Sequence, residues 1–170
     1  MTTLTTERLV LRPLVADDLD ALAAFYGDPQ VMRHVGGGRA LTHEETRASL
    51  ERMMANFQRA GYGQWAVVER SSGTFLGRAG ILEWPDLGPS GETEIGYLLG
   101  RPYWGHGYAT EAALAARDWA WRELGLRRLV SLILHGNDRS VRVAEKLGET
   151  YERDVTTVHG QTTRLFAVER

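Results

Sequence analysis

Hydrophobic and polar residues alternate along some stretches of the chain and follow a helical spacing along others, which predicts a mixture of strands and helices. Residues 8–13 place Leu9 and Leu11 on one face and arginines on the other, as in a half-buried strand. Residues 128–134 are mostly apolar, as in a strand that is covered on both sides. The predicted strands, in chain order, are 8–13, 65–69, 74–81, 93–99, 128–134, 151–158 and 163–169.

Four other stretches repeat apolar residues at helical spacing and carry the residues that helices prefer at their ends. Asp17 and Asp18 suit the first turn of a helix, where the dipole favours acidic side chains. Thr42 and Glu45 have the spacing of a capping box, and Asn137 is a good N-cap. The predicted helices, given with their capping residues, are 17–27, 42–61, 109–125 and 137–148.

The order of these elements predicts one α/β (α+β) domain that spans residues 1–170. Residues 71–73, Ser-Ser-Gly, read as a hairpin turn, and residues 159–161 join the last two strands. We find no repeat, low-complexity tract or interdomain linker. A chain of 170 residues, of which 43% are hydrophobic, can bury one ordinary core but is too short for two full domains.

The charge balance argues against a polyanionic partner. The chain has 20 lysines and arginines against 22 aspartates and glutamates, and its formal charge of -2 offers no broad positive field for nucleic acid or an anionic membrane. No apolar run approaches membrane-spanning length, and the first residues lack the basic and then apolar pattern of a secretory signal. We therefore expect a cytoplasmic protein with no nucleic-acid or membrane partner.

The residue types also limit the available chemistry. Cysteine is absent, which excludes disulfides, thiolate zinc sites and a cysteine nucleophile. The histidines show no pair at helical ligand spacing, so we expect no metal site. They are His34, His43, His106, His135 and His159.

A glycine-bearing turn between a predicted strand and a predicted helix is the most informative stretch of the chain. Strand 93–99 runs into residues 100–107, and the helix follows from Ala109. Gly105 and Gly107 remove side chains that would keep a ligand away, while unpaired N–H groups and the positive end of the helix dipole favour a phosphate there. The turn predicts a diphosphate site, although two glycines alone also suit a tight connection.

Two other nucleotide-binding motifs can be compared with this turn. A P-loop needs lysine and then serine or threonine after its second glycine, but Tyr108 and Ala109 follow Gly107, which excludes that motif. A dinucleotide-binding fingerprint needs a third glycine at the position of Thr110 and a repeated strand-helix-strand series. Nicotinamide dinucleotide binding therefore fits poorly but remains an open alternative.

Residues 104–109, Trp-Gly-His-Gly-Tyr-Ala, resemble the coenzyme A pyrophosphate loop of the GNAT superfamily of N-acetyltransferases. The likeness extends to residues 6–12, 94–97, 108–112 and 137–148, which together span nearly the whole chain. These stretches are similar to the branch that contains the ribosomal-protein N-terminal (RimJ/RimL-type) acetyltransferases.

Two residues depart from the family pattern. Trp104 stands where the superfamily commonly has glutamine or arginine, as is frequent in this branch, so phosphate contacts would come mostly from the backbone. Glu149 follows Gly148 where an apolar residue is usual, which raises a question about the packing of that turn but does not touch the chemistry directly.

The resemblance implies a mixed, mostly antiparallel sheet of about seven strands with about four helices, splayed between the fourth strand (93–99) and the fifth (128–134). Acetyl-coenzyme A would be the co-substrate, and its pantetheine amides would hydrogen-bond along the splayed strand edge like an added chain. Arg101, Arg139 and Arg142 flank this site. The residues expected to bind the coenzyme are Tyr97, Leu98, Leu99, Trp104, Gly105, His106, Gly107, Tyr108, Ala109, Thr110 and Asn137.

Acetyl transfer to an amine then needs only direct attack within a ternary complex. Glu94 is our first choice for the general base, acting through water and contributing about 10²- to 10⁴-fold, and Glu92 and Glu83 remain alternatives. A backbone N–H near Leu98 would stabilise the oxyanion. The resemblance places Ser140 near the sulfur as a proton donor for the departing thiolate.

We therefore expect an N-acetyltransferase whose acceptor stays open between a protein N-terminus and a small-molecule amine. Loops 28–41 and 84–92 are the segments expected to select the acceptor. A noncatalytic acyl-coenzyme A-binding or sensor domain on the same fold is the alternative. A homodimer is a common arrangement for small soluble enzymes.

Overall fold

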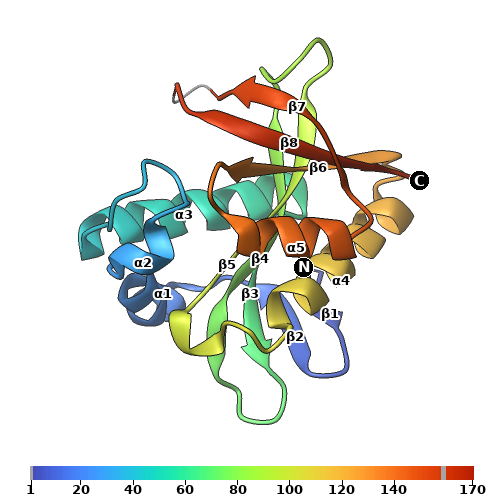
Figure 1. The fold of residues 1–170 in the computed structure, drawn as a ribbon. Coiled ribbons are helices and arrows are strands. Elements are labelled where there is room, and N and C mark those ends of the chain that lie inside the picture. The colour runs from blue at the N-terminus through green and yellow to red at the C-terminus, as the bar shows by residue number, and fades with distance from the viewer. Residues whose placement is uncertain (1, 158–159) are drawn as a thin grey trace.

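One continuous sheet of eight strands runs through the computed structural model, which describes residues 2–157 and 160–170 (Figure 1). The strands lie in the order β1-β2-β3-β4-β5-β6-β8-β7. All neighbours are antiparallel except β5 and β6, which are parallel. The strands are β1 (Leu4–Thr5), β2 (Leu9–Pro13), β3 (Gln64–Glu69), β4 (Phe75–Trp84), β5 (Glu92–Leu99), β6 (Arg128–Leu134), β7 (Thr150–Thr156) and β8 (Thr162–Glu169).

Helices cover both faces of this sheet. Figure 1 shows α1, α2 and α3 together on the left and α5 at the front of the molecule. Within the described residues, no helix combines the length and the apolar character that crossing a membrane requires. The helices are η1 (Ala16–Asp18), α1 (Leu19–Tyr26), α2 (Pro29–Met32), α3 (His43–Ala60), η2 (Arg101–Tyr103), α4 (Tyr108–Glu123) and α5 (Asp138–Lys146), where η marks a 3₁₀ helix.

The predicted order of strands and α-helices is confirmed, with two short additions, β1 and α2. Strand β1 makes the sheet one strand larger than expected, and α2 lies inside the segment that we interpreted as a loop. Asp28 caps α2 by accepting a hydrogen bond from Gln30 N at 2.8 Å, and Pro29 opens its first turn, a signal that the sequence contained. Strand β4 also runs three residues beyond its predicted end at residue 81, because β5 pairs with it as far as Trp84.

The structure describes the strands of the last hairpin but not the whole of its turn. Strands β7 and β8 are antiparallel neighbours, as predicted. The predicted end of β7 at Val158 and the turn residue His159 lie outside the described residues.

The alternation of side chains along the strands assigns the helices to opposite faces. Trp65 and Val67 of β3 pack in one apolar cluster with α4, whereas Ala66 packs with α1 and α3 on the other face. The buried stripe of α4 consists mainly of alanines, such as Ala112 and Ala116, which allow the helix to approach the sheet closely.

The parallel pair at the centre of the sheet is splayed. Strands β4 and β5 pair along their whole lengths, but among the described residues β5 and β6 pair only at Glu94 and Val130. Beyond that pair the strands separate, and Figure 1 shows their carboxyl ends apart. The predicted splay between these two strands is confirmed, and it brings the starts of α4 and α5 to the same edge of the sheet.

Candidate functional site

The turn that leads from β5 into α4 presents backbone N–H groups to solvent. Gly105 and Gly107 have φ angles of 79° and 81°, in the left-handed region that glycine adopts readily. The first backbone bond of the helix runs from Glu111 N to Gly107 O at 3.0 Å, so the amides of residues 108–110 have no acceptor within α4. A Cβ added at Gly105 would meet no atom within 4 Å, and the turn is therefore open to a ligand.

A cluster from the beginning of the chain clamps the back of this turn. Arg8 donates from Nη1 to His106 O at 2.9 Å and from Nε to Glu111 Oε2 at 2.7 Å. Thr6 Oγ1 also donates to Glu111 Oε1, at 2.6 Å. The sequence reasoning missed this clamp, although residues 6–12 and 108–112 had each contributed to the resemblance. The clamp anchors this loop to the strand that begins at Leu9, and without it the shape of the loop would depend mainly on the conformations of its glycines.

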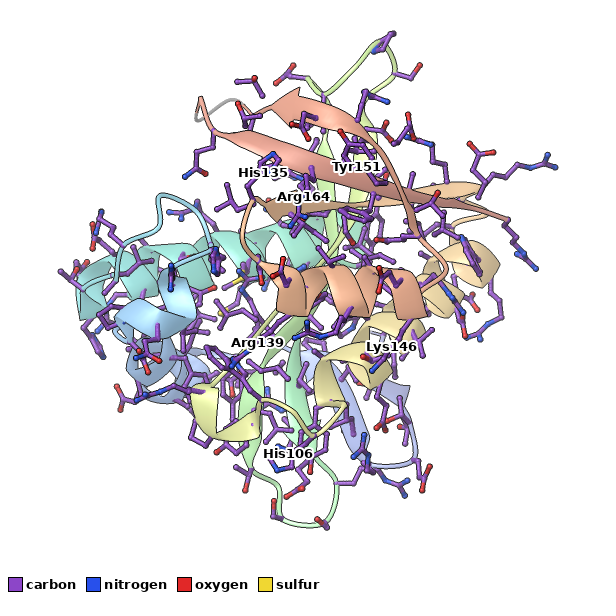
Figure 2. All side chains as sticks on the ribbon, viewed as in Figure 1. His106, His135, Arg139, Lys146, Tyr151 and Arg164 are labelled. Atoms are coloured by element: carbon purple, nitrogen blue, oxygen red, sulfur yellow. The ribbon has the colours of Figure 1, made fainter. Side chains whose placement is uncertain are left out.

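Basic residues surround the space between this turn and α5. Figure 2 shows His106, Arg139 and Lys146 around that part of the surface, and the Arg139 guanidinium lies 4.6 Å from the centre of the Trp104 ring. Arg101 instead pairs with Asp28 at 3.1 Å, away from the turn. Arg142 is exposed on α5. Of the three predicted arginines, Arg139 therefore has the contact nearest to the proposed coenzyme site.

The peptide groups of β5 alternate between its two neighbours. Gly100 N donates to a β4 carbonyl at 2.9 Å, and Leu98 pairs with Arg78 in the same register. Because successive residues of a strand direct their peptide groups to opposite sides, Leu98 faces β4, whereas Tyr97 and Leu99 face the side where β6 has separated. The N–H groups that face the opening next to Leu98 are therefore those of Tyr97 and Leu99, and the oxyanion donor near Leu98 stays a prediction.

The Trp104 side chain already forms a hydrogen bond with the carbonyl of Leu99. Its indole Nε1 donates to Leu99 O at 2.8 Å, so the side chain of this loop residue lies against the end of β5. The N–H of Leu99 and the N–H and C=O of Tyr97 still point toward the opening between β5 and β6. This edge matches the place predicted for the pantetheine arm.

Glu94 lies where β5 and β6 part. Its Oε2 accepts a hydrogen bond from Trp84 Nε1 at 2.7 Å, and its Oε1 accepts one from Leu132 N at 3.4 Å. Burial raises the pKa of the Glu94 carboxyl above its ordinary value, against the opposing effects of these hydrogen bonds and of the Arg78 charge. A carboxyl with a raised pKa beside an opening in the sheet is a candidate general base.

The two alternative carboxylates have other partners. Glu92 pairs with Arg128 through two contacts of 3.1 Å, which joins β5 to β6 at the closed end of the splay. Glu83 is exposed and accepts a hydrogen bond from Tyr62. Of the three predicted candidates, only Glu94 is a half-buried carboxyl that lies at the point of separation and has no ion pair with the described residues.

The start of α5 lies against β5. Asn137 caps the helix, as predicted, because its Oδ1 accepts a hydrogen bond from Ser140 N at 3.3 Å. The Tyr97 hydroxyl donates to Ser140 O at 3.4 Å, across from β5 to α5. Burial raises the pKa of the Tyr97 hydroxyl, so this side chain stays a neutral donor. Asn137, Ser140 and Tyr97 therefore come together on the α5 side of the splay.

Glu149 is a buried carboxyl that the sequence reasoning did not assign to the site. Its side chain is 2% exposed, and its Oε1 accepts a hydrogen bond from Ser131 Oγ at 3.1 Å. Ser131 in turn reaches Ile95 O at 3.5 Å, which places the pair beside the separation of β5 and β6. The departure from the family pattern at this position was the available signal.

Comparisons with known proteins agree with this geometry. A family model described as an acetyltransferase (GNAT) domain matches residues 8–150. The uncharacterized protein YkkB of Bacillus subtilis (strain 168) is 34% identical over 157 residues, which cover 91% of this chain and 88% of YkkB.

Solved structures share the whole fold. The crystal structure of an acetyltransferase from Agrobacterium tumefaciens str. C58 superposes with a TM-score of 0.86 at 34% identity, covering 100% of this chain and 95% of that one. RimL, a ribosomal L7/L12 alpha-N-protein acetyltransferase solved with coenzyme A, gives a TM-score of 0.79 at 17% identity, covering 99% of this chain and 98% of RimL. At that lower identity the likeness to RimL concerns the fold alone.

Proposed function

Since this chain belongs to the GNAT family and is thereby an acetyl-coenzyme A-dependent acyltransferase, we propose that it acetylates a primary amine by direct attack in a ternary complex. The observation that carries this proposal is the position of Glu94, a half-buried carboxyl where β5 and β6 part. The acceptor is either a protein N-terminus or a small-molecule amine.

The coenzyme would bind at the edge of the sheet where α4 and α5 begin. The amides of residues 108–110 would hold the diphosphate, because they lack acceptors within α4 and stand at the positive end of its dipole. Tyr97 and Leu99 would bind the pantetheine arm through their peptide groups, with Asn137 contributing its side-chain amide. The bound coenzyme supplies an acetyl thioester, whose carbonyl is the electrophile.

Glu94 would prepare the acceptor. The raised pKa of this carboxylate makes it a stronger base than an exposed glutamate, so it can remove a proton from the ammonium form of the amine, directly or through water. The amine nitrogen then bonds to the thioester carbonyl carbon. The N–H of Tyr97 or Leu99 would stabilise the negative charge that develops on the carbonyl oxygen.

Ser140 would assist the departure of the thiolate. As the bond from carbon to sulfur breaks, the sulfur carries the electron pair and needs a proton. The first turn of α5 holds Ser140 in place through its contacts with Asn137 and Tyr97. We assign proton donation to the Ser140 hydroxyl, which regains a proton from the attacking nitrogen as the amide forms.

Release of free thiol from acetyl-coenzyme A, measured across a panel of amines and N-terminal peptides, tests this mechanism. We expect Glu94→Gln to lower kcat by about 10²- to 10⁴-fold and to remove the loss of activity that wild type shows as pH falls through the raised pKa of Glu94. Ser140→Ala should lower kcat without changing the acid limb. Glu83→Gln, at an exposed glutamate, is the matched control.

Two outcomes would contradict the proposal. An acid limb that persists in Glu94→Gln would remove Glu94 from the role of base. Tight binding of coenzyme A without acetylation of any amine or peptide in the panel would instead support the noncatalytic sensor.

A further inference from the structure

Arg78 projects from β4 on the same face of the sheet as Glu94. The β4–β5 register places Arg78 opposite Leu98 and Leu82 opposite Glu94, and side chains two residues apart along a strand share a face. Between these two rungs, Gly80 lies opposite Gly96, and the Leu82 side chain lies over Gly96. Arg78 and Glu94 thus stand on either side of a glycine pair.

The Arg78 guanidinium is held rigidly by neutral groups. Its Nε donates to the Tyr26 hydroxyl at 2.5 Å, and its Nη1 donates to Gln64 Oε1 at 2.6 Å. Across residues 2–157 and 160–170, no carboxylate lies within ion-pair distance of Arg78, and its Nη2 has no protein acceptor. A half-buried cation usually has an anionic partner, and this one lacks such a partner within the described chain.

Gln64 adds a second unused donor to the same place. Its side chain is 3% exposed, and its Nε2 has no hydrogen-bond partner among the described residues. Gln64 lies opposite Gly80 in the ladder, and a Cβ added at Gly96 would lie 3.8 Å from Gln64 Nε2. The amide nitrogen therefore points over the glycine pair that separates Arg78 from Glu94. Buried donors without partners are rare and require an explanation.

We propose that Arg78 Nη2 and Gln64 Nε2 bind a carboxylate of the acceptor, so that the substrates of this enzyme are amines that also carry a carboxylate. This inference rests on the proposed function, because Glu94 deprotonates the amine while Arg78 and Gln64 hold the acid group. Two N–H donors from planar groups match the two oxygens of a carboxylate. Leu82, whose Cδ1 lies over Gly96, is the apolar side chain beside the bound acceptor.

Paired acceptors test this inference. We would measure kcat and KM for a series of α-amino acids, each compared with its decarboxylated amine and its carboxamide, and for phosphoethanolamine. Wild type should acetylate the amino acids with a KM about tenfold or more below that of the two neutral analogues, as expected for hydrogen bonds to a charged group. Arg78→Met should remove that advantage in KM, so that carboxylated and neutral acceptors give similar KM values.

Gln64→Glu provides a second variant that keeps the shape of the site. It gives Arg78 a carboxylate of the protein itself, so we expect the same loss of preference for carboxylated acceptors without a void in the core. Arg164, labelled in Figure 2, is another half-buried arginine and lies 5.8 Å from the Phe166 ring. Arg164→Met is the matched control and should keep the wild-type preference.

The outcomes separate this inference from the proposed function. Equal use of amino acids and decarboxylated amines, or a preference for phosphoethanolamine, would overturn the carboxylate site and leave the acetyltransferase standing. If no acceptor reacts, thermal unfolding with acetyl-coenzyme A and amino acids decides: stabilisation by the coenzyme alone overturns the carboxylate site. Absence of coenzyme binding would overturn the proposed function itself.

Discussion

Glu149 shows what the protein environment does to a single side chain. The carboxyl is buried beside Ser131, and desolvation raises its pKa to about 8, an effect to which the charge of Glu94 adds and which Arg117 opposes. The same carboxyl in an unfolded chain has an ordinary pKa near 4.5. The folded protein therefore keeps a proton on Glu149 at pH values where the unfolded chain has lost it.

This difference predicts how stability depends on pH. Because the folded state binds the extra proton between pH 4.5 and about 8, the contribution of Glu149 is complete below pH 4.5 and is lost as pH rises through 8. We expect the free energy of unfolding to fall in this window by up to about 1.4 kcal/mol per pH unit relative to Glu149→Gln. Urea unfolding of both proteins from pH 5 to 8 measures the difference.

Glu145, which is exposed on α5, provides the control. Glu145→Gln should retain the wild-type slope, including the part that comes from the raised pKa of Glu94. Equal slopes for wild type and Glu149→Gln would show that Glu149 is ionised in the folded protein.

At the scale of elements, α4 has a glycine in the left-handed region at each end. Gly107 precedes the helix with a φ of 81°, and Gly125 follows it with a φ of 64°. Only Gly107 stands at the positive end of the helix dipole, beside the amides that we assign to the diphosphate. The two ends can therefore separate backbone strain from ligand binding.

We expect Gly107→Ala and Gly125→Ala each to lower the free energy of unfolding by about 1–2 kcal/mol, because alanine is strained in the left-handed region. Only Gly107→Ala should also weaken coenzyme A binding, since its Cβ would lie 3.4 Å from Arg8 Nη2 and would disturb the turn. Calorimetric titration with coenzyme A and chemical denaturation measure the two quantities. A comparable loss of affinity in Gly125→Ala would contradict the assignment of the diphosphate to this corner.

Local signals predicted most of the elements. The capping box of Thr42 and Glu45 forms as expected, because both of its bonds depend on residues three positions apart. Helix α2 was missed because four residues offer too little hydrophobic periodicity, although the Asp28 cap and Pro29 marked its start. Strand β1 is a two-residue strand and gives no alternation to read.

At the scale of the whole molecule, the sheet order determines which parts of the site meet. Parallel pairing of β5 and β6 brings the N-termini of α4 and α5 to one edge, which the family resemblance implied and periodicity alone did not. The contacts between Arg78, Gln64 and Tyr26 join α1 to the consecutive strands β3 and β4, and Arg78 and Tyr26 are 52 positions apart. No local pattern encodes such a cluster, so this part of the site emerged only from the structure.

The clamp behind the phosphate turn gives a prediction at this scale. Glu111 accepts hydrogen bonds from Thr6 and from both the backbone and the side chain of Arg8. We expect Glu111→Ala to cost about 1–2 kcal/mol of stability and to weaken coenzyme A binding several-fold, because the loop loses its anchor. Glu123→Ala, at an exposed glutamate in the last turn of α4, should leave the affinity unchanged. Unchanged affinity in Glu111→Ala would show that the glycine turn holds its shape unaided.

This clamp also has a consequence for biosynthesis. Arg8 and Glu111 are 103 positions apart, so a nascent chain carries its arginine out of the ribosome long before the matching carboxylate has been translated. Until then the guanidinium has only solvent or transient partners. The phosphate turn therefore gains its anchor late in translation, when Arg8 and Glu111 finally meet.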